Sequence, residues 1–350
     1  MRYINRRTII IGAFFMAVAA VGTFAVAQNI RYAEAPAKIE IRALPIASFD
    51  NRDPTRVRFG ALEFRGGLEL TSSFSAFGGI SGLIMADHDR LIAVTDHGSW
   101  LKARLVYRDG RLAGLADAEM APLLGADGKA LATQGARDSE SLTRIGADYY
   151  VGIERVERIL RFAFDKQGFA ARGADIPVPS DFKSFGKNGS LECLVAPPPG
   201  QPYAGKLVVI TERVLDAAGH HRAFVLDPAG KQKDGDGGVL RFSLKRSDDF
   251  DITDCTMLPP GDVLVLERRY SPARGVAMRI RKLPLKSIEE GALADGPQLI
   301  EADLGYQIDN MEGIAVTRNA AGETIVTLVS DDNFSVVQRN LILQFALVGD

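Results

Sequence analysis

The sequence contains few of the side chains that commonly form zinc, redox or nucleophilic sites. Two cysteines, four histidines and one tryptophan occur in 350 residues. No histidine has a zinc-ligand spacing to a cysteine, which argues against a zinc site. No Gly-x-Ser-x-Gly elbow is present and no Ser–Asp–His order stands out, so a serine esterase would lack its nucleophile. Candidate chemistry must therefore come mainly from carboxylates and arginines.

The chain also lacks an excess of charge of one sign and sustained helical periodicity. Its formal net charge is −2, so it lacks the excess of positive charge typical of nucleic-acid-binding proteins, and no nucleic-acid partner is predicted. Short apolar runs rich in Val, Ile, Leu, Phe and Tyr alternate with turn pairs, which predicts β-strands. The 35 glycines and 16 prolines are consistent with many tight turns. These features predict an all-β protein.

The N-terminal segment reads as an export signal. Three arginines precede an apolar run over residues 8–27, which ends in Ala25-Val26-Ala27. This pattern is typical of a signal peptide over residues 1–27, of the ordinary type or of the twin-arginine type that Arg6-Arg7 suggests. An uncleaved anchor is the alternative, because about 20 apolar residues can span a bilayer. We therefore expect a periplasmic or secreted protein that contacts a membrane only if this segment is retained.

A repeated order of elements dominates the rest of the chain, after a linker or lead-in expected over residues 28–57. Five times a carboxylate-bearing or glycine-rich loop precedes an apolar strand, and a second strand then ends in an acid. The starts are 78–83, 138–142, 189–194, 252–258 and 310–315, and the acid-tipped strands are 91–96, 149–154, 207–212, 263–267 and 326–331. Such repetition at about 50–60 residues indicates a β-propeller, in which equivalent positions converge on one axis.

Strand material at 58–70 and 340–347 belongs to none of the five repeats. The simplest prediction is a propeller over residues 58–350 with six blades, in which strands from both ends of the chain form the sixth blade. Pairing of the N- and C-terminal strands would then remove the exposed sheet edges of an open array. A monomer is expected.

Carboxylates occupy equivalent places in these repeats. The metal-ligand candidates are Glu140, Glu192, Asp254 and Glu312 near the strand starts, and Asp96, Glu154, Glu212 and Glu267 at the strand ends, where Asp331 completes the second set. Hard oxygen donors that converge suit Ca²⁺, which takes six to eight of them, or Mg²⁺. We predict a divalent cation, Ca²⁺ first and Mg²⁺ as the alternative. A second interpretation stays open, in which the acids are scaffolding that caps backbone N–H groups or pairs with arginines.

Three arginines directly follow acids of the second set, and they are Arg155, Arg213 and Arg268. Arginine binds anionic oxygens with charge-assisted hydrogen bonds, so these residues are predicted to hold a small anionic ester substrate. Glu312 or Asp331 would orient the attacking water. His97 beside Asp96 is a candidate general base, although a histidine after a strand is more often a hydrogen-bonded loop residue.

The two cysteines, Cys193 and Cys255, directly follow acids of consecutive repeats. An oxidising compartment permits a disulfide. Equivalent positions in neighbouring blades are often farther apart than the about 4.4–6.8 Å between Cα atoms that a disulfide needs. Two buried free thiols are therefore favoured over a bridge.

Several segments resemble one known family. The best matches are residues 309–316, 328–334 and 340–347, with looser matches at 138–142, 188–194 and 265–268. They resemble the phytase-like family of exported bacterial proteins, described by an esterase-like activity of phytase, over roughly residues 57–348. The resemblance implies a propeller and hydrolysis of an ester or phosphate ester, and places Glu140, Glu192, Glu312 and Asp331 on the family's pattern. His97 stands where the family commonly has an arginine.

Together these observations predict an exported metal-dependent hydrolase of an ester, with a phosphate ester as the first candidate. The alternative is a non-catalytic periplasmic propeller that binds a ligand or a protein partner, because fold alone never fixes function. A lactonase-type enzyme with a cage of Glu140, Asn188 and Asp254 is a third interpretation.

Overall fold

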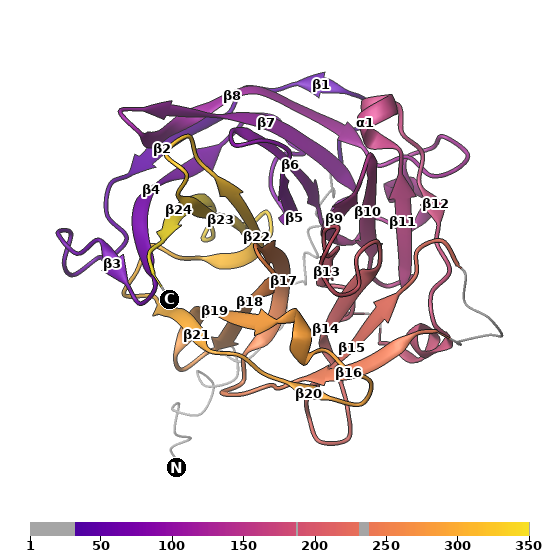
Figure 1. Cartoon of the computed structure of the whole chain (residues 1–350). Coiled ribbons are helices and arrows are strands. Elements are labelled where there is room, and N and C mark those ends of the chain that lie inside the picture. The colour runs from indigo at the N-terminus through magenta and orange to yellow at the C-terminus, as the bar shows by residue number, and fades with distance from the viewer. Residues whose placement is uncertain (1–31, 187, 231–237, 350) are drawn as a thin grey trace, which may run out of the picture. The chain divides into compact units, whose positions relative to one another are not determined.

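The structure is a computed structural model that describes residues 32–186, 188–230 and 238–349. The predicted signal peptide lies outside the described residues. Five sheets, antiparallel apart from one short parallel pairing, surround a common centre, so the fold is a β-propeller (Figure 1). The all-β propeller prediction is confirmed, but it has five blades and not six.

Blades 1 to 3 follow one another along the chain, and each begins with its innermost strand. Blade 1 holds β5 (Ile80–Met85), β6 (Arg90–Thr95), β7 (Ser99–Arg108) and β8 (Arg111–Pro122), with β1 (Ala37–Lys38) at its edge. Blade 2 holds β9 (Ser139–Ile145), β10 (Asp148–Ile153), β11 (Arg158–Phe162) and β12 (Ala174–Asp175). Blade 3 holds β13 (Cys193–Val195), β14 (Leu207–Leu215), β15 (His221–Leu226), β16 (Leu240–Leu244) and β20 (Leu293–Ala294).

Blades 4 and 5 complete the ring, and blade 5 combines the two ends of the chain. Blade 4 holds β17 (Asp251–Leu258), β18 (Asp262–Ser271), β19 (Gly275–Pro284) and β21 (Gln298–Asp303). Blade 5 holds β22 (Asn310–Arg318), β23 (Thr324–Asp331), β24 (Asn340–Leu347), β4 (Leu62–Thr71) and β2 (Arg42–Ile46), and β3 (Arg58–Phe59) pairs with β4. The described residues form few helices: α1 (Phe164–Gln167) and four 3₁₀ turns at Leu131–Gln134, Gly168–Ala170, Ser180–Ser184 and Leu285–Ser287.

The chain ends close the propeller as expected, but within an existing blade. β24 pairs with β4 over most of its length, from Asn340 opposite Leu70 to Leu347 opposite Leu62. These strands belong to the same sheet as β22 and β23, so they complete the fifth blade and do not form a sixth. The expected lead-in takes part as well, because β1 and β2 pair with the outer strands β8 and β4.

The hydrophobic core is divided into five clusters, each lying between two neighbouring blades. Trp100, for example, is fully buried and packs with Tyr149, Phe162 and Phe164 between blades 1 and 2. Successive side chains of a strand point to opposite faces of its blade. Both faces of a blade pack against neighbouring blades, so the inner strands carry apolar side chains on both faces. Among the described residues, no helix has the length and apolar character needed to cross a membrane.

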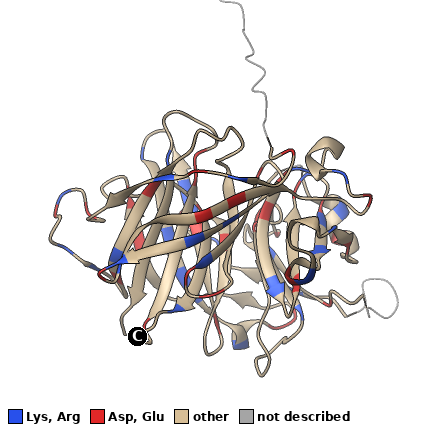
Figure 2. Ribbon diagram, turned by 90° about the horizontal axis from the view of Figure 1, so that it is seen from above, with Lys and Arg blue, Asp and Glu red and all other residues tan. Residues whose placement is uncertain are grey.

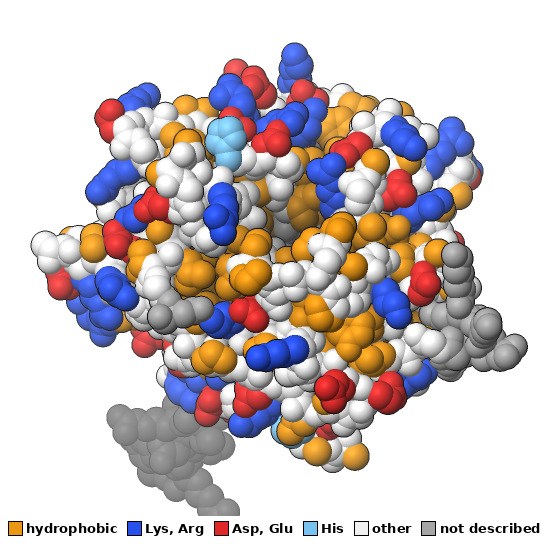
Figure 3. Space-filling model, in the orientation of Figure 1, with side chains coloured by type: hydrophobic (Ala, Val, Ile, Leu, Met, Phe, Trp, Pro, Cys, Tyr) orange, Lys and Arg blue, Asp and Glu red, His pale blue; other side chains and the backbone are white. Residues whose placement is uncertain are grey.

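The two faces of the propeller differ. Each inner strand starts, and each second strand ends, at one face, which we call the channel mouth. β24 starts beside this mouth, where the Asn340 Nδ2 atom donates to Asp332 Oδ2 at 2.8 Å, and it runs to the C-terminus on the opposite face (Figures 1 and 2). Figure 3 shows that opposite face, where hydrophobic side chains lie around the middle and charged side chains mostly toward the periphery.

Candidate functional site

One extra residue near the start of each inner strand shapes the channel mouth. In blade 2, Ser139 lies opposite Ile153 and Ser141 opposite Gly152, so Glu140 has no partner and forms a β-bulge. In blade 5 the same irregularity leaves Glu312 unpaired between Met311 and Gly313. A bulge re-aims a side chain locally, and here it turns two glutamates toward the channel.

The same irregularity recurs in the other three blades. In blade 1 it falls between Ile80 and Leu83 and includes Ser81. In blade 3, the Arg213 N–H donates to Gly189 O, and Cys193 pairs with Ile210. Between these two contacts the inner strand has one residue more than the second strand. By analogy with blades 2 and 5, the bulge residue is Glu192. In blade 4 the unpaired residue is Thr253, between Ile252 and Asp254.

The residue after the bulge contacts the next blade in every case. A Cβ atom on Gly82 would lie 2.6 Å from Leu142 N, and one on Gly313 would lie 2.6 Å from Ser81 O. The Ser141 hydroxyl donates to Leu191 O at 2.5 Å. These small residues let the inner strands approach closely, which explains the small residues that follow the acid in most repeats.

Cys193 and Cys255 form a disulfide, so the preference for free thiols is wrong. Their Cα atoms lie 5.1 Å apart, within the usual range. Cys193 stands one position after its bulge residue Glu192, whereas Cys255 stands two positions after Thr253. This offset of one residue brings the two side chains together across the contact of blades 3 and 4.

The bulges and strand ends surround a cavity of about 180 Å³ at the channel mouth. Its lining consists almost entirely of charged and polar side chains: Ser81, Asp96, Asp138, Glu140, Glu154, Arg155, Asn188, Glu192, Glu212, Arg213, Arg268, Glu312, Asp331 and Asn333. The structure therefore brings together seven of the nine repeated acids and all three predicted arginines. Asp254, Glu267 and His97 are not part of this lining.

Blade 4 differs because its strand register is displaced by one residue relative to the repeat read from the sequence. Arg268 lies opposite Asp251, as Asp331 lies opposite Asn310 in blade 5. The structural equivalents of the strand-start and strand-end acids are therefore Thr253 and Arg268, and not Asp254 and Glu267. Since side chains alternate between faces, a shift of one residue turns a side chain away.

Asp254 faces the neighbouring blade and not the cavity. It is fully buried, and its two oxygens accept the N–H groups of Cys255 at 2.7 Å and of Ile314 in β22 at 2.8 Å. Burial raises its pKa well above the usual value for an aspartate. Its position matches that of Gly82, Ser141 and Gly313, so Asp254 joins blades 4 and 5.

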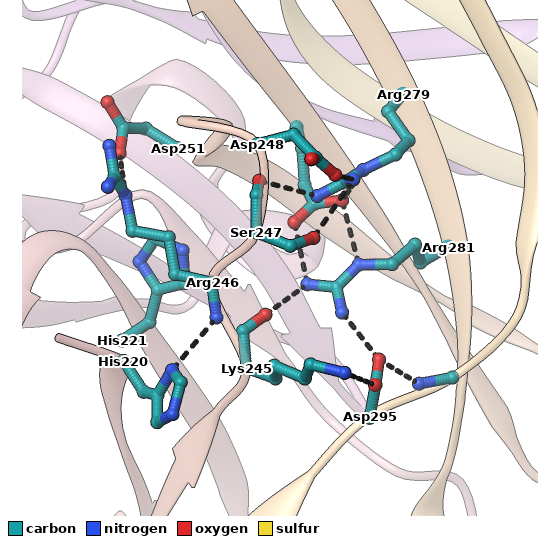
Figure 4. Close-up of polar contacts among 12 residues, drawn as sticks. His220, His221, Lys245, Arg246, Ser247, Asp248, Asp251, Arg279, Arg281 and Asp295 are labelled. Carbon is teal, nitrogen blue, oxygen red and sulfur yellow. Dashed lines mark hydrogen bonds and ion pairs between the residues drawn. The ribbon is translucent and has the colours of Figure 1, made fainter. Parts of the chain in front are cut away.

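Glu267 lies inside blade 4 between two buried arginines. Its Oε2 atom accepts from Arg279 Nε at 2.7 Å and Arg281 Nε at 2.8 Å, and its Oε1 atom from Arg281 Nη2 at 2.6 Å. Figure 4 shows both guanidinium groups reaching on to the connection after β16, where Arg281 bonds Lys245 O and Arg279 bonds Ser247. All polar atoms of this network have protein partners, so Glu267 serves as scaffold.

The three cavity arginines are held in different ways. Arg155 pairs with Asp138 and is half-exposed. Arg213 pairs with Asp251 at 2.9 Å and with Glu212 at 3.2 Å, and it is also half-exposed. Arg268 is more deeply placed, with Nε 3.3 Å from Glu312 Oε1 and Nη2 3.6 Å from Glu212 Oε1.

Burial and mutual repulsion raise the pKa values of the seven repeated carboxylates that line the cavity. Burial raises the pKa of Glu312 to about 8 and those of Glu212 and Asp331 to about 7, although Arg268 lowers all three. For Asp96, Glu140 and Glu192 burial and neighbouring carboxylates raise the pKa well above the usual range. The ring therefore either retains protons or gains a cation, which would relieve the same repulsion.

The carboxylates of blades 1 and 2 fit a cation best. Oxygen atoms of Asp138, Glu140 and Glu154 all lie within 4.8 Å of one another. Asp96 Oδ1, which also lines the cavity, is buried and has no hydrogen-bond partner. Asp138 was not among the sequence candidates, although it lies two residues before Glu140 and so on the same face of an extended strand. Asn188 and Asn333 add neutral oxygen donors to the same cavity.

His97 lies just outside the cavity lining. Its ring stacks on Phe334 with centroids 4.2 Å apart, and its Nε2 atom lies 3.8 Å from Asp96 Oδ2. It is mostly buried, so it packs behind Asp96. His97 thus contacts Phe334 and Asp96 and does not line the cavity in which a substrate would bind.

Fold and site together define a five-bladed propeller with an acidic and arginine-lined pocket at one end of its channel. The chain belongs to the phytase-like family, described as esterase-like activity of phytase, whose model matches residues 75–334. No curated protein matches the sequence.

Solved structures of similar fold include enzymes of different activities. An endo-arabinase from Bacteroides thetaiotaomicron VPI-5482 is 11% identical, with 78% of this chain and 95% of that chain covered and a TM-score of 0.49. The α-L-arabinofuranosidase PaAbf62A from Podospora anserina, in complex with cellotriose, is 9% identical, with 79% and 93% covered and a TM-score of 0.49. At these identities the likeness concerns the fold alone.

Proposed function

We propose that the channel mouth is the active site of a metal-dependent hydrolase that acts on a phosphate ester. One observation carries the proposal: a single cavity holds seven repeat-derived carboxylates, Asp138 and three arginines. Carboxylates supply a cation site, and arginines supply contacts for an anionic substrate. Membership of the phytase-like family supports hydrolysis of an ester.

A cation would be held by Asp96, Asp138, Glu140 and Glu154 on the side of blades 1 and 2. These are hard oxygen donors, which suit Ca²⁺ or Mg²⁺ and not a soft metal. When bound, such an ion would polarise a phosphoryl oxygen and lower the pKa of a coordinated water. Lining asparagines and water would complete its coordination.

The arginines would bind the phosphate group. Arg155 and Arg213 are half-exposed at the rim, so they can meet the substrate first, while Arg268 lies deeper. A cavity of about 180 Å³ is smaller than the about 300–1,000 Å³ of typical ligand pockets. We therefore expect the cavity to hold the phosphate group and the alcohol part of the substrate to remain outside.

Asp331 is the proposed proton acceptor for the attacking water. Its Oδ1 atom accepts the Asn333 N–H at 2.6 Å, which fixes the carboxyl group at the cavity wall. Its pKa of about 7 is close to the value at which a general base works best near neutral pH. The water oxygen would bond to phosphorus, the phosphorus–alcohol oxygen bond would break, and the leaving oxygen would take up a proton. Glu312, which lies beside Arg268, would orient this water.

Hydrolysis by the purified full-length chain tests this proposal. Protein stripped with EDTA is assayed against a panel of phosphate and carboxylate esters, with Ca²⁺, Mg²⁺ or Mn²⁺ restored one at a time. We expect phosphate release only after a cation is restored, and loss of that release in Glu140→Gln. Release of no phosphate or alcohol under any condition would leave the non-catalytic binding propeller as the better description.

We also propose that the protein works outside the cytoplasm. The signal-like residues 1–27 motivate this, and the Cys193–Cys255 disulfide supports it, because structural disulfides persist mainly in oxidising compartments. Fractionation of cells that express the native chain tests the idea. We expect the processed protein in the periplasmic or secreted fraction, and an intact N-terminus in the cytosol would overturn it.

A further inference from the structure

Arg268 occupies a position that carries an acid in every other blade. Counted from the bulge of each inner strand, its equivalents are Asp96, Glu154, Glu212 and Asp331. All five side chains line the same cavity. The ring of strand-end residues therefore consists of four carboxylates and one guanidinium group.

Arg268 contacts acids of both neighbouring blades. Its Nε atom lies 3.3 Å from Glu312 Oε1 in blade 5, and its Nη2 atom lies 3.6 Å from Glu212 Oε1 in blade 3. Its side chain is 20% exposed, against 51% for Arg155 and Arg213. A permanent positive charge placed this deeply interacts strongly with the carboxylates around it.

Three acids of the cavity have no such partner. Within the described parts of the chain, no arginine or lysine forms an ion pair with Asp96, Glu140 or Glu192. Asp96 Oδ1 is buried without a hydrogen-bond partner. A deeply placed positive charge is thus built into the protein beside blades 3 to 5, whereas the cavity arginine of blade 2, Arg155, is half-exposed and pairs with Asp138.

We propose that Arg268 acts as a fixed substitute for a second cation, so that the cavity binds one divalent ion, on the side of Asp96, Asp138, Glu140 and Glu154. This inference rests on the proposed function, because it assumes that the cavity binds a cation. It makes Arg268 the residue that sets the number and the place of bound ions. It also leaves the opposite side positively charged, where the phosphate group of a substrate can bind.

The test is to replace the guanidinium group with the acid that the other blades have. Calcium binding is measured by isothermal titration calorimetry on the EDTA-stripped full-length protein, with CaCl₂ as the only ligand. We expect one Ca²⁺ per chain for wild type and two for Arg268→Glu, because the variant completes the ring of acids. Arg268→Lys keeps the charge and should bind one ion.

Arg213→Glu is the matched control. It changes the net charge by the same amount in the same cavity, but Arg213 lies at the rim, is half-exposed and pairs chiefly with Asp251. We expect this variant to keep a stoichiometry of one. A second ion in Arg213→Glu as well would show that net charge alone decides, and would overturn the assignment to Arg268.

Arg268→Gln serves if Arg268→Glu does not fold, as judged by circular dichroism in EDTA. Removing the charge should lower the Ca²⁺ dissociation constant by roughly tenfold or more, since a nearby cation no longer repels the ion. The inference alone fails if wild type binds one ion and Arg268 variants bind it unchanged, or if wild type binds two. If wild type binds none but Arg268→Glu binds one, Arg268 does replace a cation and the metal-dependent function fails instead. If no variant binds an ion, both fail.

Discussion

Blade 4 and blade 2 are built from the same repeated elements but contribute differently to the channel mouth. In blade 2 the bulge residue is Glu140 and the strand-end residue is Glu154, and both line the cavity. In blade 4 these places belong to Thr253 and Arg268, while Asp254 contacts blade 5 and Glu267 lies inside blade 4. A displacement of one residue thus separates candidate ligands from scaffold.

The comparison separates two kinds of carboxylate in the protein. Glu267 is fully paired with Arg279 and Arg281, so its charge is balanced within blade 4. Glu140 has carboxylates as neighbours, and burial together with their repulsion raises its pKa. The first kind should matter for stability and the second for ion binding, and substitutions can test each side.

The largest expected effect on stability comes from Glu267→Gln. The substitution leaves Arg279 and Arg281 buried without their counter-charge, and breaking a buried pair in this way costs about 3–5 kcal/mol. Urea unfolding with the disulfide intact measures this free energy. Glu301→Gln is the control, because the Arg269–Glu301 pair is 3.9 Å apart and Glu301 is exposed, so its loss should cost less than about 1 kcal/mol. Equal losses in the two variants would contradict the scaffold role.

Glu140→Gln should show the opposite behaviour. We expect the Ca²⁺ dissociation constant to rise by more than the roughly 10- to 100-fold that loss of an outer-shell partner costs, with a matching loss of ester hydrolysis. The melting temperature in EDTA should stay the same or rise, because a partly buried carboxylate without an arginine partner is removed. A marked drop in that melting temperature would assign Glu140 to the scaffold.

Asp254→Asn should weaken the protein without touching ion binding. An asparagine can accept only one of the two backbone N–H groups that Asp254 now accepts, and an unpaired buried N–H costs about 1–3 kcal/mol. The Ca²⁺ dissociation constant, measured by calorimetry, should equal that of wild type. Weaker calcium binding would place Asp254 among the ligands after all.

The pH dependence of stability tests the cavity carboxylates together, without any substitution. The folded-state pKa values of Glu312, Glu212 and Asp331, about 8, 7 and 7, exceed those of an unfolded chain, about 4. The folded state therefore binds more protons than the unfolded state between these values, and stability is lost as the pH rises through them.

Differential scanning calorimetry in EDTA should accordingly show a melting temperature that falls by several degrees between about pH 5 and about pH 8. Saturating Ca²⁺ should flatten this dependence, because the ion replaces the protons. A melting temperature that rises over the same range in EDTA would contradict the raised pKa values.

Much of the site could be found from the sequence because the repeat is explicit. Asp96, Glu154, Glu212 and Asp331 each end an apolar strand, and the propeller geometry brings them to one cavity. Asp138 could have been found by alternation from Glu140. The displacement in blade 4 was harder to see, since Asp254 and Glu267 fit the acid pattern while the true equivalents are a threonine and an arginine.

One sequence signal does mark the displacement. After the bulge residue, the other repeats have a small residue and then an aliphatic one, as in Glu140-Ser141-Leu142 and Glu312-Gly313-Ile314. In blade 4, Asp254 at the bulge would put the polar Thr256 in the aliphatic place, whereas Thr253 at the bulge puts the apolar Cys255 there and Asp254 at the small position. Which residue follows the bulge depends on how closely the inner strands of neighbouring blades approach. A sequence pattern shows such contacts only indirectly.

By itself the sequence determined the strands, the five repeats and the meeting of acids and arginines at one end, because these follow from local hydrophobic patterns and strict repetition. Only the tertiary structure decided that there are five blades, that Cys193 bonds to Cys255, and that Arg268 and not Glu267 faces the cavity. These outcomes depend on strand register and on how closely neighbouring blades approach, and a one-residue shift reverses the direction of every side chain it affects.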